Sequence, residues 1–130
     1  MRPSFVRDLQ SMISGMEPVL DEVPYHFVSD ANPALAPKAF GMVREAEGVT
    51  WIIPADAQPD HGPHFARITL QVHSDLSASG LTAAVATALA SEDIACNVVA
   101  AFHHDHLFVP WERREEALAI LNRLSDDARR

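Results

Sequence analysis

The chain has 130 residues, of which 48% are hydrophobic, and its formal net charge at pH 7 is −8. This length suits one domain or two small halves that fold together. The acidic balance argues against nucleic acid and anionic membrane surfaces as partners, because both attract basic proteins. Cys96 is the single cysteine, so an intramolecular disulfide is excluded. No apolar run approaches the roughly 20 residues that span a bilayer, and a cytoplasmic location is therefore expected.

The first half of the chain predicts one helix followed by short strands. Apolar residues at helical spacing, after a potential cap at Ser4, predict a helix that ends near Met16. Three segments with strand character follow, at residues 25–28, 39–44 and 49–54. Gly48 can supply the positive φ that a tight hairpin between the last two strands needs. The polar segment 55–63 contains two prolines and a glycine, and it is expected to separate the two halves.

Residues 65–124 carry the clearest pattern, which predicts strand, helix, strand, strand and helix. Apolar and polar residues alternate within 65–74, which is typical of a strand with one buried face. A helix with apolar residues at helical spacing follows over 80–89. Segment 94–101 is apolar nearly throughout, which predicts a central strand covered on more than one side. A polar turn at 103–106, another strand and an amphipathic helix complete the pattern.

This order of elements is most of a split β-α-β unit, the ferredoxin-like arrangement of α+β proteins. Such a unit needs a final strand, but none follows the helix that ends near Leu124. The missing strand must come from the first half or from a second subunit, and the first half is the economical donor. The predicted core of this unit is formed by ten residues: Ile68, Leu70, Val72, Val85, Leu89, Ile94, Cys96, Val98, Leu118 and Leu121.

Several stretches resemble the small bacterial ACT-domain proteins that are built from two ACT-like halves. In the second half the similar stretches are 72–85, 94–100 and 104–110. In the first half they are 16–18, 25–28 and 43–50. The resemblance implies tandem ferredoxin-like ACT units at 1–62 and 63–130. It also implies mixed or antiparallel sheets, helices on one face, and an exchange of terminal strands between the halves.

ACT units elsewhere typically bind amino acids and regulate attached enzymes or transcription factors. The resemblance therefore implies a non-catalytic regulatory or sensor module without a cofactor, whose partner is a small molecule, most simply an amino acid. A homodimer is compatible with it. No Ser-His-Asp or Cys-His grouping follows from the spacing of the residues, so no catalytic residue is assigned.

The turn from Ser74 to Gly80 is the predicted ligand site. A helix begins after it, and the unpaired N–H groups of a helix start suit a carboxylate. Gly80 lets a ligand approach the backbone closely, and Asp75 can pair with an ammonium group. Asn97 matches the position where ACT units often place an asparagine. The predicted ligand-binding residues are Ser74, Asp75, Ser79, Gly80, Leu81, Thr82, Asn97 and Val98.

The cluster of His103, His104, Asp105 and His106 supports an alternative, because imidazoles and carboxylates bind divalent metals. Side chains alternate along an extended hairpin, so His104 and His106 are expected on one face and the other two on the opposite face. Two ligands on one face are too few, and no metal site is assigned. The alternatives are a metal-dependent enzyme that uses this cluster, and a ligand-free module that binds partners through a sheet edge or helix face.

Overall fold

A computed structural model describes residues 5–58 and 62–130. The strands are β1 (Pro18–Ser29), β2 (Gly41–Glu45), β3 (Gly48–Pro54), β4 (Phe65–Leu70), β5 (Asn97–Ala100) and β6 (Asp105–Pro110). The α-helices are α1 (Leu9–Ser14), α2 (Leu81–Ala90) and α3 (Arg114–Ala128). Short 3₁₀ helices occupy Pro33–Lys38, Ala55–Ala57 and Trp111–Arg113.

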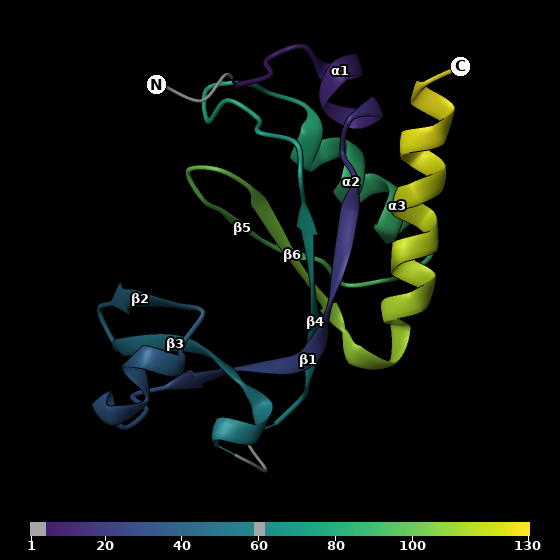
Figure 1. Ribbon diagram of the computed structural model, residues 1–130. Helices are drawn as coiled ribbons and strands as arrows, with labels where there is room; N and C mark the ends of the chain where they lie inside the picture. Colours follow the sequence, from purple (N-terminus) through teal and green to yellow (C-terminus); the bar gives the residue numbers. More distant parts are fainter. Residues whose placement is uncertain (1–4, 59–61) are drawn as a thin grey trace.

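The described strands form one sheet in the order β2-β3-β1-β4-β6-β5, and every neighbouring pair is antiparallel. Helices α2 and α3 lie on the same side of this sheet, while β2 and β3 extend from its far end (Figure 1). The predicted α+β class with helices on one face is confirmed. No described helix is long and apolar enough to cross a membrane.

Strand β1 belongs to both parts of the sheet. Its first part pairs with β4, from Pro18 opposite Leu70 onward, and its last part pairs with β3. The register shifts between Leu20 and Pro24, and such an irregularity tolerates a proline and bends a strand. The first half of the chain therefore supplies the strand beside β4. A reciprocal exchange is not confirmed, since the described strands β2 and β3 pair only with each other and with β1.

The N-terminal elements differ from the sequence prediction in their lengths. Helix α1 is shorter than predicted because it begins after Asp8, whose carboxylate accepts a hydrogen bond from the Ser11 N–H at 2.9 Å. The predicted cap Ser4 lies outside the described residues. The hairpin between β2 and β3 forms where predicted, and Gly48 has a φ of +148°. A side chain there would also meet the Asp30 carboxylate at 2.6 Å, so both backbone and space require glycine.

The main core lies between the sheet and the helices. Seven of the ten predicted core residues are buried: Ile68, Leu70, Val72, Val85, Leu89, Ile94 and Leu121. The other three are partly buried and pack against this core: Cys96, Val98 and Leu118. The sequence periodicity therefore assigned the buried faces of β4, α2 and α3 correctly.

The prediction of a central strand over 94–101 is wrong. Strand β5 lies at the edge of the sheet, where β6 is its one neighbour among the described strands. Its apolar character has another cause, because both of its faces are in contact with apolar groups. Val98 packs against the helix-side core, whereas Val99 packs against an aromatic cluster around Phe108 on the opposite face.

Candidate functional site

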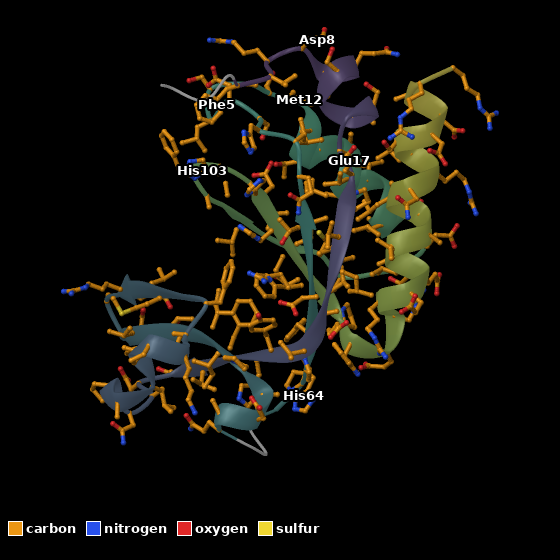
Figure 2. All side chains as sticks on the ribbon, viewed as in Figure 1. Phe5, Asp8, Met12, Glu17, His64 and His103 are labelled. Carbon is orange, nitrogen blue, oxygen red and sulfur yellow. The ribbon has the colours of Figure 1, made fainter. Side chains whose placement is uncertain are left out.

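A pocket of about 490 Å³ lies at the connection between β4 and α2, a size suited to a small molecule. We call it the loop pocket. Six of the eight predicted ligand-binding residues line it: Ser74, Asp75, Ser79, Gly80, Leu81 and Thr82. Further walls come from Met12 of α1 and Ala100 of β5, and Figure 2 shows Met12 beneath α1. Residues far apart in the sequence thus surround the predicted turn.

The start of α2 gives the loop pocket its capacity for an anion. Gly80 occupies the N-cap position with a φ of +108°, and no side chain of the described residues caps the helix. The first N–H groups of an α-helix have no intrahelical partner, and here they belong to Leu81, Thr82 and Ala83, which all line the pocket. A carboxylate at this position would accept hydrogen bonds and meet the positive end of the helix dipole.

The Asp75 carboxylate already has partners. One oxygen accepts the Ser77 N–H at 2.8 Å, and the other lies 3.3 Å from Nη1 of Arg7. The Arg7 side chain is 67% exposed, and ion pairs of this kind contribute little stability. A ligand ammonium group could therefore replace Arg7 beside Asp75 at small cost.

Asp105 is a pocket residue that the sequence did not identify. It is 9% exposed, it lines the loop pocket, and it accepts a hydrogen bond from Ser74 Oγ at 3.1 Å. Sequence reasoning assigned it to a polar turn, but it is the first residue of β6 and lies opposite Ala100. The pairing of β6 with both β4 and β5 places Asp105 opposite Leu70 and Ala100 and so brings it to the pocket, and nothing local signals these pairings.

Asn97 and Val98 do not line the loop pocket. Asn97 lies opposite Phe108 and is exposed, on the side of the sheet that the helices leave open. Val98 points the other way, into the core beneath the helices. The register of β5 therefore places Ala100 at the pocket, three residues further along the strand.

Imidazoles gather around the turn between β5 and β6. The ring centroid of His73 lies 4.9 Å from that of His104, which lies 6.3 Å from that of His106. Figure 2 shows Phe5 beside the turn that carries His103. Among the described residues, no group of three or more His, Cys, Asp or Glu side chains is arranged to hold a metal ion.

A second pocket, of about 560 Å³, lies on the helix-free face of the sheet. We call it the sheet-face pocket. Its polar lining includes Asp21 of β1, Arg67 and Thr69 of β4, and His106 of β6. The sequence prediction missed it entirely, because strand pairing alone brings these residues together.

A hydrogen-bonded network fixes the base of the sheet-face pocket. Nη2 of Arg67 donates to Oδ2 of Asp21 at 2.7 Å, and the Tyr25 hydroxyl donates to the same oxygen at 2.8 Å. Burial alone would raise the pKa of Asp21, but hydrogen bonds from Tyr25, Val23 and Arg67 outweigh it and lower that pKa. Burial and the neighbouring Asp21 raise the pKa of Tyr25 to about 12. The carboxylate is therefore charged and the phenol neutral near pH 7.

His106 completes this network with a neutral imidazole. Its Nδ1 lies 3.0 Å from the Thr69 hydroxyl oxygen. Burial, then the charge of Arg67, then His104, lower the pKa of His106 to about 4. Since the imidazole is uncharged at neutral pH, one of its ring nitrogens donates and the other accepts.

Comparisons with known proteins agree with this architecture. ACT-domain family models match residues 5–66 and 64–123 in tandem. A crystal structure of a Vibrio cholerae protein of unknown function, described as a possible transport protein, is 36% identical with a TM-score of 0.74. It covers 86% of this chain, which in turn covers 92% of that protein. No curated protein matches the chain.

Two more distant structures share the fold. An Agrobacterium tumefaciens protein is 20% identical, with a TM-score of 0.63 over 78% of this chain and 81% of its own. The ligand-free regulatory subunit of aspartate kinase from Thermus thermophilus is 12% identical, with a TM-score of 0.60 over 85% of this chain and 97% of its own. At these identities the likeness concerns the fold alone.

Proposed function

Because the chain belongs to the ACT-domain proteins, we propose that it is a regulatory module that binds an amino acid in its loop pocket. The uncapped start of α2 beside Gly80 is the observation that carries this proposal. It provides backbone donors for a carboxylate, and Asp75 provides a negative charge for an ammonium group. The likeness to a regulatory subunit of aspartate kinase supports a regulatory role.

The surroundings of the loop pocket favour an apolar ligand side chain. Leu76 and Phe102 are 63% and 59% exposed, and with Phe5 they surround a small hollow next to Asp75. Exposed apolar groups beside a polar pocket mark a surface that gains from being covered. An aliphatic or aromatic amino acid could cover them while its two charges stay in the loop pocket.

The proposal assigns no catalytic residue and treats the two halves as one folding unit. Strand β1 joins halves 1–62 and 63–130, because it pairs with β3 on one side and β4 on the other. Strand β5 lies at the sheet edge, and an exposed edge can pair with a second chain. A homodimer formed along this edge is part of the proposal.

Titration calorimetry and thermal unfolding with each of the twenty amino acids test the proposal. A ligand present at 100 times its Kd should add about 2.7 kcal/mol to the free energy of unfolding. No heat and no stabilisation from any of them at millimolar concentration would contradict it.

A matched pair of variants locates the ligand. Thr82→Pro removes one N–H from the first turn of α2 without removing an intrahelical hydrogen bond, whereas Thr82→Ala keeps that N–H. Loss of one charge-assisted hydrogen bond should weaken binding about 10- to 150-fold in the proline variant alone. Gly80 is unsuitable for this test, because its φ is positive and an added Cβ would lie 3.0 Å from the Leu9 side chain, so any substitution would be strained.

A further inference from the structure

The sheet-face pocket is separate from the loop pocket. In the antiparallel register Thr69 lies opposite both Val19 and His106, so these three side chains share one face of the sheet. Ile68 and Leu70 point to the other face, into the core beneath the helices. The two pockets have no lining residue in common among the described residues. A ligand on this face would therefore not displace one in the loop pocket.

Arg67 is held in place at the sheet-face pocket before any ligand arrives. Its guanidinium carbon lies 4.6 Å from the ring centroid of Phe40 and 5.4 Å from that of Tyr25, while Asp21 accepts from Nη2. Contacts of this kind orient an arginine through cation–π attraction. Because the side chain is already ordered, a ligand pays little entropy to use it.

The guanidinium is not fully satisfied. The Nε atom of Arg67 is buried and has no hydrogen-bond partner among the described residues. A buried donor without an acceptor is unfavourable, but a ligand can meet Arg67 only through the part of its side chain that stays exposed, which is 24%. Arginine's planar set of donors matches the paired oxygens of a carboxylate or a phosphate.

A neutral donor stands next to this cation, because the hydrogen bond between Thr69 and His106 uses one of their two N–H and O–H groups and leaves the other. The Thr69 hydroxyl and the His106 ring are in contact, and both line the pocket with Arg67. Arg67 lowers the pKa of His106, so its positive charge reaches the imidazole although Asp21 lies beside the guanidinium. The part of the pocket between these residues is therefore suited to a negative group.

The charges that line the pocket have both signs. Asp21 and Glu22 are acidic, and Arg67 is basic. A simple carboxylate would meet two acids, and a simple amine would meet the arginine, whereas a zwitterion can place each of its charges beside an opposite one. We propose that the sheet-face pocket is a second binding site, for a small zwitterion of the α-amino-acid class.

The orientation of the ligand follows from the lining. Its carboxylate lies between Arg67, Thr69 and His106, and its ammonium group points toward Asp21 and Glu22. Val19 and Val23, which are 51% and 41% exposed, cover an aliphatic side chain. Burying this apolar surface adds to affinity, so valine, leucine and isoleucine are the ligands expected to fit.

Imidazole nitrogen NMR of the full chain tests the proposal, because it reports on this face directly. The probes are valine, leucine and isoleucine, each with its deaminated acid and its decarboxylated amine as controls. At least one of the three amino acids should shift the His106 signals and raise the pKa of that imidazole, since an anion beside it favours the charged form. Its acid and amine should bind at least tenfold more weakly. If no amino acid shifts the signals, or a control binds equally well, the proposal is wrong.

Variants separate this site from the loop pocket. Thr69→Val keeps the side-chain shape and removes the hydroxyl, which should weaken binding about 2- to 10-fold. Arg67→Lys removes the planar donor set and should weaken binding about 10- to 150-fold. Thr87→Val, on the exposed side of α2, is the matched control and should leave affinity unchanged. If Arg67→Lys fails to fold, Thr69→Val decides.

The loop-pocket variant Thr82→Pro should leave the His106 shift intact. If instead Thr82→Pro abolishes that shift and Thr69→Val does not, the signals report the loop pocket. The second site is then wrong while the proposed function stands. Weaker binding in Thr69→Val, with binding unchanged in Thr82→Pro, supports the second site, whether or not the loop pocket binds anything.

Discussion

The two faces of strand β4 have different surroundings. On the helix side, Ile68 and Leu70 are almost completely buried beneath α2 and α3. On the other side, Arg67 and Thr69 remain partly exposed and belong to a polar network. One strand thus contributes its even-numbered residues to the core, and Arg67 and Thr69 on its other face to a polar pocket. A sheet that helices cover on one face can therefore carry a polar pocket on the other face.

The helix-free face is itself divided. Toward β3, Phe108 is completely buried in an aromatic cluster with Tyr25 and Ile52, and Phe40 packs against it. Toward the turn between β5 and β6, the same face carries His104 and His106. In Figure 1 the β2–β3 hairpin extends from the far end of the sheet, and Phe40, which precedes β2, reaches the border of the polar part, where its ring centroid lies 4.8 Å from that of His106. Because the aromatic side chains cover Arg67 and His106 only in part, these two side chains are ordered and yet open to a ligand.

Phe108→Ala should have the largest effect on stability, although no helix covers this residue. Removing a buried phenylalanine typically costs about 3–5 kcal/mol, a large part of an ordinary free energy of unfolding of about 5–15 kcal/mol. Urea denaturation measures the loss. A cost below about 1 kcal/mol would mean that the aromatic part of the helix-free face is not a packed core, and the division of that face would fail.

Leu70→Ala should cost about 2–5 kcal/mol, the usual range for a buried leucine. Its neighbour in sequence, Thr69, points to the opposite face, and Thr69→Val should change the free energy of unfolding by only about 1 kcal/mol because one neutral hydrogen bond is lost. The same denaturation experiment compares the two. Equal costs at the two positions would contradict the assignment of the faces of β4.

Local sequence patterns were sufficient for the helix-covered face. The alternation along β4 and the helical spacing in α2 identified buried residues such as Ile68 and Val85. The turn that ends at Gly80 was found in the same way, because a strand, a polar turn and a helix follow one another in the chain. Features determined by a few neighbouring residues could be predicted.

Features determined by strand pairing could not be predicted. The first part of β1 was missed because Asp21, Glu22 and Pro24 interrupt its apolar pattern, and pairing with β4 is what makes it a strand. Arg67 and Asp21 are 46 residues apart in sequence, so nothing local connects them. The prediction that Asn97 lies at the loop pocket was wrong, because it came from a motif match, and a motif match carries no information about strand register.

Acidification should lower the free energy of unfolding through groups on the helix-free face of the sheet, and this is the smallest of the expected effects. The pKa of His106 falls to about 4 in the folded chain from an ordinary value of 6.5. The unfolded state therefore binds more protons than the folded state between these two pH values. The contribution of the neutral His106 imidazole to the free energy of unfolding is thus complete above about pH 6.5 and is lost as the pH falls toward 4. The imidazole is only half-buried, so solvent screening reduces the contribution to about 1 kcal/mol. Asp21, whose pKa is lowered from 3.8, loses its contribution only at still lower pH.

His106→Gln removes the titrating group and should flatten the decline in stability between pH 6.5 and 4. His103→Gln is the matched control, because His103 is exposed at the same turn and is not among the causes of the His106 shift. Urea denaturation at several pH values gives both curves. If the two variants lose the same stability over this range, the imidazole on the helix-free face is as accessible to solvent as the one at the turn. The polar part of that face would then be an ordinary exposed surface, and the contrast between the two pockets would rest on the loop pocket alone.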